Sequence, residues 1–147
     1  MRICLGSDHA GLELKARIFA HLESIGHTVT DVGTVGPTSV DYPDFAREVA
    51  RRVASGTDER GVLVCGTGQG MAIAANKVAG CRAAVVGEPF SAVAAMEHND
   101  ARVLCLGQRV TGPGLALLIV DAWLGASFAG GRHAGRVAKM EPGSVTG

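Results

Sequence analysis

The stretch Gly61–Gly70 reads GVLVCGTGQG and joins a short apolar run to a glycine-rich loop. The run Gly61–Cys65 predicts a buried strand, and the alternating glycines lead the chain into a helix predicted over Met71–Val78. The same succession of apolar run, turn and helical pattern recurs along the chain. Strands that alternate with helices in this way are typical of parallel βαβ units.

Five strands are expected, each followed by a helix. The strands are predicted at Arg2–Leu5, His27–Val32, Gly61–Cys65, Arg82–Val86 and Val103–Leu106. The helices are predicted over 12–25, 43–56, 71–78, 89–98 and 114–124, with a short basic helix starting near Arg132. Together they predict an α/β fold, a Rossmann-like open parallel five-stranded sheet with helices on both faces. We expect a single domain over residues 1–141 and a flexible tail over 142–147.

The composition argues against several classes of function. The 147 residues include 14 basic and 14 acidic side chains, so no net charge attracts nucleic acid or an anionic membrane. The N-terminus matches neither a signal nor a transit peptide, and the longest apolar run, 115–124, is interrupted by Asp121 and too short to span a bilayer. Four scattered cysteines without CxxC spacing indicate reduced thiols and a cytoplasmic protein.

Polar side chains gather in the loops that follow the predicted strands. In an open parallel sheet, ligands bind beyond the carboxyl ends of the strands. The loops at that edge are 6–11, 65–70, 87–89 and 107–112. They carry Asp8, His9, Cys65, Thr67, Glu88 and Arg109. The sequence therefore places its candidate chemistry at the edge where this fold binds ligands.

The loop Cys65–Gly70 is the strongest candidate for a site. Its alternating glycines let backbone N–H groups approach a ligand, and the following helix adds the positive end of its dipole. Such a loop suits an anion or a developing oxyanion, and the thiol beside it suits a base or a nucleophile. The loop has no Walker A lysine, and Met71 stands where a dinucleotide loop needs glycine and a cysteine-phosphatase loop needs arginine. The alternative is a tight turn with Cys65 in the core.

Six further polar residues have a structural interpretation beside a functional one. Those after the first strand and at the end of the helix over 89–98 suit turns and helix caps as well as a site. Two arginines four residues apart suit a solvated surface or an anion held between them. The six are Asp8, His9, His98, Asn99, Arg132 and Arg136. Arg109 is well placed for phosphate recognition, and no metal site is predicted because no two histidines or cysteines have ligand spacing on one element.

Taken together, these motifs resemble the type B ribose-5-phosphate isomerases, a family that also includes the galactose-6-phosphate isomerase subunits of lactose operons. The resemblance covers residues 2–139. In chain order it is carried by Gly6-Ser7-Asp8-His9-Ala10-Gly11, Asp41-Tyr42-Pro43, Cys65–Gly70, Ala74-Ala75-Asn76-Lys77, Glu88-Pro89, His98-Asn99, Gly107-Gln108-Arg109, Val120–Leu124 and Gly131-Arg132-His133 with Arg136. So many motifs in one order make chance similarity implausible.

The resemblance implies an aldose–ketose isomerase of the pentose phosphate pathway that interconverts ribose 5-phosphate and ribulose 5-phosphate through a cis-enediolate. It implies that Cys65 is the base that moves a proton between C1 and C2. Backbone N–H groups of Gly66, Gly68 and Gly70 would stabilise the enediolate. No metal or other cofactor is implied.

The resemblance also implies roles for the remaining polar residues and for a second subunit. Thr67 and His98 match residues linked to opening of the furanose ring, and Asp8 and Asn99 match residues that bind sugar hydroxyls. The matches to phosphate-binding positions are His9, Arg109, Arg132 and Arg136. The family forms homodimers, often assembled further into tetramers, in which each active site is shared between two subunits.

The sequence leaves the identity of the sugar open. A hexose 6-phosphate or a tetrose 4-phosphate would suit the same chemistry, with substrate choice decided at loop 33–42 and Gln69. A non-catalytic subunit that binds a phosphorylated sugar is a further alternative, although both Cys65 and His98 are present. One branch of the family replaces the cysteine by serine and uses a nearby glutamate as base, but here only the cysteine mechanism is supported.

Overall fold

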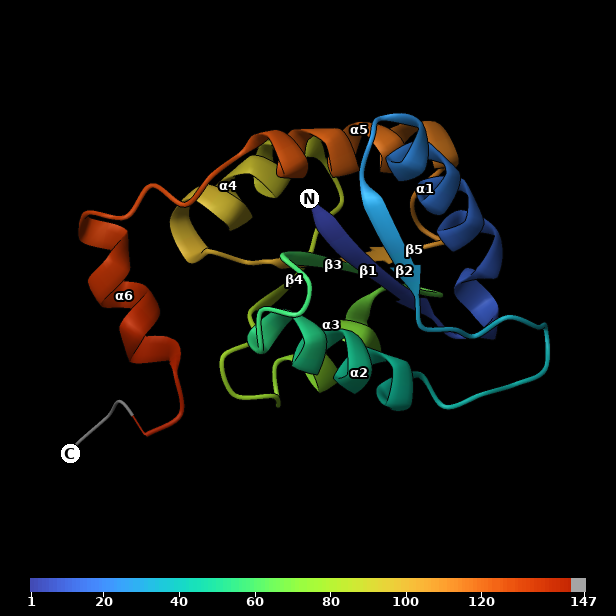
Figure 1. Ribbon diagram of the computed structural model, residues 1–147, viewed down its shortest axis with the longest axis horizontal. Coiled ribbons are helices and arrows are strands. Elements are labelled where there is room, and N and C mark those ends of the chain that lie inside the picture. Colours follow the sequence, from blue (N-terminus) through green and yellow to red (C-terminus); the bar gives the residue numbers. More distant parts are fainter. Residues whose placement is uncertain (144–147) are drawn as a thin grey trace.

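Five parallel strands form one sheet in the order β2-β1-β3-β5-β4 in a computed structural model of the protein, of which residues 1–143 are described (Figure 1). The strands are β1 (Arg2–Ser7), β2 (Thr28–Asp31), β3 (Arg60–Cys65), β4 (Ala83–Val85) and β5 (Val103–Gly107). A short 3-10 turn, η1 (His9–Gly11), follows β1. The helices are α1 (Leu12–Ser24), α2 (Tyr42–Ala54), α3 (Gln69–Ala75), α4 (Pro89–Asn99), α5 (Pro113–Gly125) and α6 (Arg132–Met140).

The predicted fold class is confirmed, and the expected elements differ from the observed ones by a few residues at their ends. The order of the strands reverses between β1 and β3, so their loops diverge to opposite faces of the sheet. Of the tail predicted over 142–147, Pro142 and Gly143 form a turn, and residues 144–147 lie outside the described part. None of the helices within residues 1–143 is long and apolar enough to cross a membrane.

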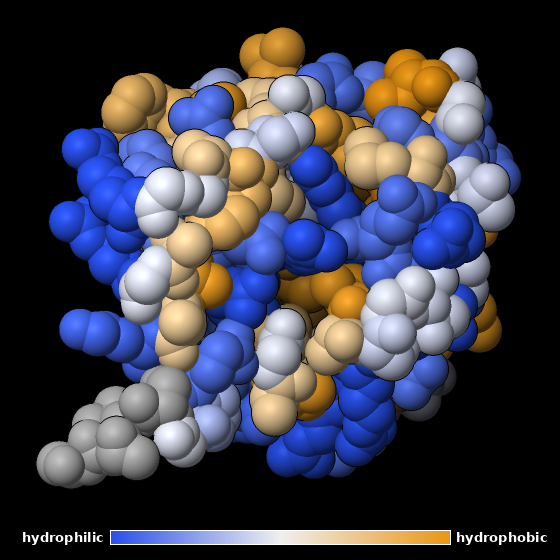
Figure 2. Space-filling view, turned by 60° about the vertical axis from the view of Figure 1, so that its left-hand side comes forward, coloured by the Kyte–Doolittle hydropathy of each residue, from blue (hydrophilic) through white to orange (hydrophobic). Residues whose placement is uncertain are grey.

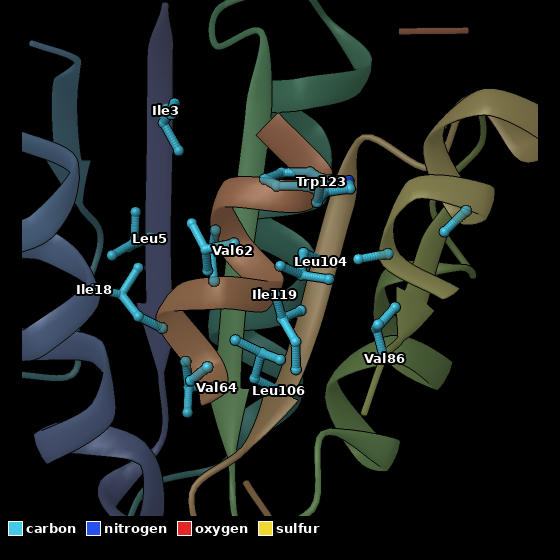
Figure 3. Packing of buried hydrophobic residues seen from close by; sticks show 14 of the residues in the cluster. Ile3, Leu5, Ile18, Val62, Val64, Val86, Leu104, Leu106, Ile119 and Trp123 are labelled. Atoms are coloured by element: carbon cyan, nitrogen blue, oxygen red, sulfur yellow. The ribbon is translucent and has the colours of Figure 1, made fainter. Parts of the chain in front are cut away.

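Two apolar cores, one on each face of the sheet, hold the layers together. The larger core lies between the sheet and helices α1, α4 and α5 (Figure 3). Its largest buried side chains are Ile3, Leu5, Ile18, Leu22, Leu104, Leu106, Ile119 and Trp123. The smaller core lies under α2 and α3 and includes Val49, Leu63, Met71 and Cys105. Because the central strands are covered on both faces, they are apolar at nearly every position instead of alternating.

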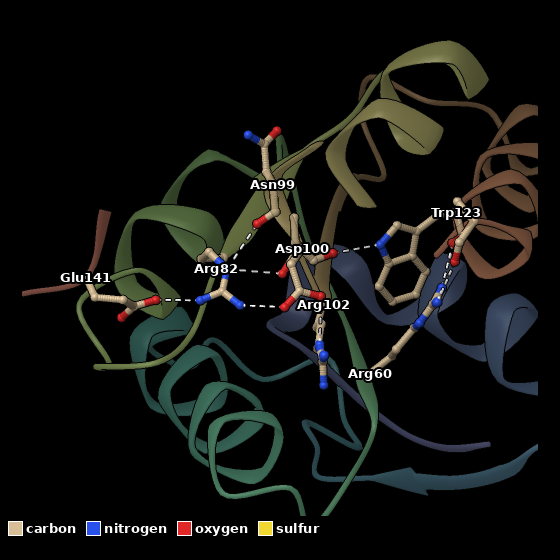
Figure 4. Close-up of polar contacts among 9 residues, drawn as sticks. Arg60, Arg82, Asn99, Asp100, Arg102, Trp123 and Glu141 are labelled. Atoms are coloured by element: carbon tan, nitrogen blue, oxygen red, sulfur yellow. Dashed lines mark hydrogen bonds and ion pairs between the residues drawn. The ribbon is translucent and has the colours of Figure 1, made fainter. Parts of the chain in front are cut away.

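Trp123 anchors the C-terminal end of α5 to the sheet. Its side chain is 0% exposed, and its indole nitrogen donates a hydrogen bond of 2.8 Å to the carbonyl of Ala101. The guanidinium of Arg60 lies 5.1 Å from the centre of the indole and donates to the carbonyls of Trp123 and Ala126 (Figure 4). A cation that caps carbonyls at a helix C-terminus also complements the helix dipole. These contacts tie α5 to β3.

We expect Trp123→Ala to lower the free energy of unfolding by about 3–5 kcal/mol, because it removes a buried aromatic side chain and its hydrogen bond. Urea titration followed by circular dichroism measures the loss. Leu118→Ala is the matched control on the same helix, since Leu118 is 60% exposed, and should cost no more than about 0.5 kcal/mol. Equal losses in the two variants would contradict the assigned packing.

Candidate active site

The loops after β1, β3 and β5 are bonded to one another at the carboxyl edge of the sheet. The backbone N–H of Asp8 donates to Val64 O over 3.3 Å. The N–H groups of Gln108 and Arg109 donate to the carbonyls of Cys65 and Gly66 over 2.9 and 3.0 Å. These bonds extend the strand pairing past the ends of the strands, so the three loops form one continuous surface.

Cys65 lies at the centre of this surface, where its thiol receives a backbone hydrogen bond. The N–H of Gly68 donates to Sγ of Cys65 over 3.0 Å. Gly68 has φ of 82°, in the left-handed region that favours glycine, and this conformation turns its N–H back toward the sulfur. A donor aimed at sulfur stabilises the thiolate, the form of cysteine that acts as base or nucleophile.

The other three cysteines lie in surroundings that raise the pKa of their thiols. Burial, together with the carboxylate of Asp58, raises the pKa of Cys4 to about 12. Burial raises the pKa of Cys81 to about 11 and that of Cys105 well above its usual range. All four thiols are free, but these three are held in the protonated form at neutral pH.

Thr67 and Arg109 lie beside Cys65 and are exposed to solvent. Gly107 allows the end of β5 to approach the Thr67 backbone, because a Cβ at position 107 would lie only 2.6 Å from Cα of Thr67. The Arg109 side chain lies along Gly66, where an added Cβ would be 3.1 Å from Nη1. No carboxylate within residues 1–143 forms an ion pair with Arg109. Its guanidinium is therefore available to an anion bound over the loop.

Asp8 and His9 occupy the neighbouring loop after β1. The Asp8 carboxylate, which is buried, accepts a hydrogen bond of 2.9 Å from Ala10 N, so Asp8 caps η1 as the structural interpretation of the sequence predicted. Nδ1 of His9 faces the N–H of Val40 at 3.2 Å. Because Nδ1 accepts this bond, the neutral ring carries its proton on Nε2, which can donate to an anion.

The structure adds two residues that the sequence did not single out. The ring of Tyr42, at the start of α2, lies against Gly70, where an added Cβ would be 2.6 Å from the ring. The side-chain carbonyl of Gln108 accepts a 3.0 Å hydrogen bond from Leu14 N at the start of α1. Tyr42 forms a wall of the site, and Gln108 joins two of its loops. Both stand inside quoted motifs, but only the tertiary contacts reveal what they touch.

The remaining predicted residues lie at the opposite edge of the sheet. His98 and Asn99 end α4, directly before the amino end of β5. Arg82 fixes this corner by donating to the carbonyl of Asn99 over 3.0 Å and to the Asp100 carboxylate over 2.7 Å (Figure 4). Strand β5 has five residues and is about 16 Å long. Within one chain, His98 and Asn99 are therefore a strand length away from Cys65.

Arg132 and Arg136 lie on α6, which stands apart from the sheet and its covering helices (Figure 1). Figure 2 shows the face that carries this helix, where hydrophilic and apolar side chains surround a hollow. Neither arginine has an ion-pair partner within the described residues. No group of three or more His, Cys, Asp or Glu in that part of the chain is arranged to hold a metal ion.

Known proteins are similar to this chain along almost its whole length. A model of the Ribose/Galactose Isomerase family matches residues 3–140. Ribose-5-phosphate isomerase B of Escherichia coli K12 is 52% identical over 136 residues, which are 92% of this chain and 91% of that protein. D-erythrulose-4-phosphate isomerase of Pectobacterium atrosepticum is 45% identical over 142 residues, 95% of this chain and 93% of that protein. The structure of ribose-5-phosphate isomerase B from Clostridium thermocellum, 55% identical, has a TM-score of 0.94 and covers 95% of each chain.

We expect iodoacetamide at pH 8 to alkylate Cys65 before the other cysteines. A thiol with a pKa of about 11, such as Cys81, is ionised in about one molecule in a thousand at this pH, and Cys4 and Cys105 are ionised less. Peptide mass spectrometry identifies the site and the rate of labelling. Cys65→Ser should abolish the early modification and Cys81→Ser should leave it intact. First labelling at Cys81 or Cys105 would refute the assignment.

Proposed function

The chain belongs to the ribose/galactose isomerase family, and we propose that it interconverts ribose 5-phosphate and ribulose 5-phosphate. The family membership agrees with the resemblance drawn from the motifs. The observation that carries the proposal is the Cys65 thiol, which has the Gly68 N–H on its sulfur and the Arg109 guanidinium along the same loop. A base, an N–H donor and a cation therefore lie together at the binding edge of the sheet.

The proposed reaction is a proton transfer and needs no oxidant or reductant. The Cys65 thiolate takes the proton from C2 of the open-chain aldose, and the electron pair of that bond forms a C1–C2 double bond while the carbonyl oxygen O1 gains the negative charge. The thiol then returns its proton to C1, and a proton moves from O2 to O1. Backbone N–H groups of the glycine-rich loop stabilise the enediolate, because fixed dipoles cost no reorganisation as the charge develops.

The remaining roles follow the placement of the side chains. In the proposal Asp8 and Asn99 bind sugar hydroxyls, and Thr67 and His98 open the furanose ring. His9 donates from Nε2 to the phosphate, since its Nδ1 is engaged by Val40 N. Arg109, Arg132 and Arg136 supply the positive charge that a phosphate dianion needs.

Two subunits are required to complete this site. Cys65 and Thr67 lie at the carboxyl edge of the sheet, and His98, Asn99 and the arginines of α6 lie beyond the amino edge. We therefore infer a homodimer in which each site combines the carboxyl edge of one chain with the His98 corner of its partner. Further pairing of such dimers into a tetramer stays a prediction of the family resemblance. Phosphorylated sugars are metabolites of the cytoplasm, and we place the enzyme there.

A tetrose 4-phosphate is the second candidate substrate, because an erythrulose-4-phosphate isomerase is 45% identical along nearly the whole chain. A four-carbon sugar phosphate cannot close a furanose ring through its phosphorylated O4, so it would need no ring opening. Comparison of kcat/KM for ribose 5-phosphate, erythrose 4-phosphate and a hexose 6-phosphate decides between the substrates. The proposal requires ribose 5-phosphate to have the highest value.

We expect Cys65→Ala to lower kcat for ribose 5-phosphate by at least about 10²- to 10⁴-fold, the contribution of a general base. Affinity for ribitol 5-phosphate, an unreactive open-chain polyol phosphate, should change little in calorimetry, because the phosphate groups of the site are intact. Cys81→Ala is the matched control and should keep its turnover. Near-normal turnover by Cys65→Ala would rule out the thiol as base, and absence of turnover by the unaltered protein would favour a non-catalytic subunit.

The shared site is tested by mixing two inactive variants, Cys65→Ala and His98→Ala. After subunit exchange at equal concentrations, half of the dimers are mixed, and each mixed dimer holds one intact site of two. We therefore expect about a quarter of the unaltered activity to return. If each site were built within a single chain, no activity would return, because every chain would carry one inactivating substitution in its own site.

A further inference from the structure

The rings of His98 and His133 are stacked on one another. Their centroids are 4.5 Å apart and their planes differ by 13°. His98 lies in the last turn of α4, and His133 lies in the first turn of α6. The pair therefore joins two helices that are separated by more than thirty residues of chain, and both histidines belong to the half-site that the proposed dimer presents to its partner.

The stack is the side-chain contact that orients His98. The His98 side chain is exposed, and within residues 1–143 its ring makes no hydrogen bond. An exposed histidine near a helix end turns freely about its side-chain bonds unless a neighbour restricts it. A face-to-face neighbour at 4.5 Å fixes the plane of the ring while leaving both ring nitrogens open at its edge.

The same contact helps to hold α6 in place. No residue of α6 is buried, so the helix depends on contacts at its two ends. Near its start, Ala129 N donates to Glu97 O over 2.9 Å, and His133 stacks on His98. Just beyond its end, the Glu141 carboxylate accepts from Gly80 N over 3.1 Å and pairs with Arg82. Arg132 and Arg136 are carried by the segment between these two ends.

The charges around the pair suit a stack in which His133 stays neutral. Partial burial and the positive charges of His98, Arg132 and Arg136 lower the pKa of His133. A neutral ring can face a second imidazole in either protonation state without repulsion between two cations. His98 can then change its proton during a reaction while the stack persists.

We propose that His133 is a positioning residue for His98: its ring holds the His98 imidazole in one plane, while the contacts of Ala129 and Glu141 keep helix α6 in place without it. This inference rests on the proposed isomerase function, because it assigns to His98 the opening of the sugar ring. His133 itself does not exchange a proton with the substrate. A flat aromatic ring is what the role requires, so phenylalanine should replace it and alanine should not.

Two variants separate positioning from the other roles. We expect His133→Ala to lower kcat for ribose 5-phosphate about tenfold or more, with KM within about threefold, because a misplaced catalytic group loses rate more than binding. His133→Phe should keep kcat within about threefold of the unaltered enzyme. Lys139→Ala, an exposed position on the same helix, is the matched control and should leave both constants unchanged.

A spectroscopic measurement tests the stack independently of activity. In proton NMR of the histidine rings, the His98 signals should carry an upfield ring-current shift that His133→Ala removes and His133→Phe keeps. Calorimetry with ribitol 5-phosphate shows whether α6 still supplies its arginines, and we expect little change in affinity for either variant.

Three results would overturn the inference. A rise in KM with unchanged kcat in both variants would make His133 a phosphate-binding residue. A kcat for His133→Phe as low as that for His133→Ala would mean that the imidazole itself is needed. Full activity of His133→Ala would remove the role altogether. Lack of turnover by the unaltered protein, with the ring-current shift present, would instead refute the proposed function and leave the stack standing.

Discussion

Parallel pairing of the strands is the constraint on which the rest of the structure depends. Because every strand runs in the same direction, all loops that follow strands meet at one edge, and every covering helix returns the chain to the other edge. Cys65 is the last residue of a strand and Arg109 follows one, whereas His98 lies in the last turn of a helix, so the topology places His98 a strand length away from the other two. The proposed site uses all three residues and cannot close within one sheet, so the proposal needs a second subunit.

The same topology makes one cysteine different from three others of identical chemistry. Cys4, Cys81 and Cys105 lie in the strands or shortly before one, where burial raises the pKa of each thiol. Cys65 is the last residue of its strand. The pairing of the strands ends there, and the N–H of Gly68 donates to the sulfur. The backbone N–H that faces the Cys65 sulfur is therefore a feature of the strand end, and the left-handed glycine makes it possible.

The sequence was sufficient for the fold because the information needed was local. Apolar runs such as Gly61–Cys65 and the helical pattern over 12–25 identify elements without reference to anything distant, and parallel pairing then follows from their alternation. It was not sufficient for contacts between loops. The bond from Val40 N to His9, the Tyr42 ring on Gly70 and the stack of His133 on His98 join segments whose spacing in the chain has no period. The residue types in the sequence identified the candidate site residues. Only the packing of the loops in the structure shows which residues they contact.

In the proposed dimer, helix α6 links the assembly of the two chains to the chemistry of the site. It has nine residues, none of them buried, and an isolated helix of that length is marginal in water. Within its own chain it is held near its two ends, by the stack on His98 and by Glu141. In the proposed dimer, the face that carries Arg132 and Arg136 meets the phosphate at the carboxyl edge of the partner's sheet. The substrate then supplies an anion between two arginines that otherwise repel one another. In this proposal, binding of the phosphate stabilises the helix and places His98 at the sugar in the same step.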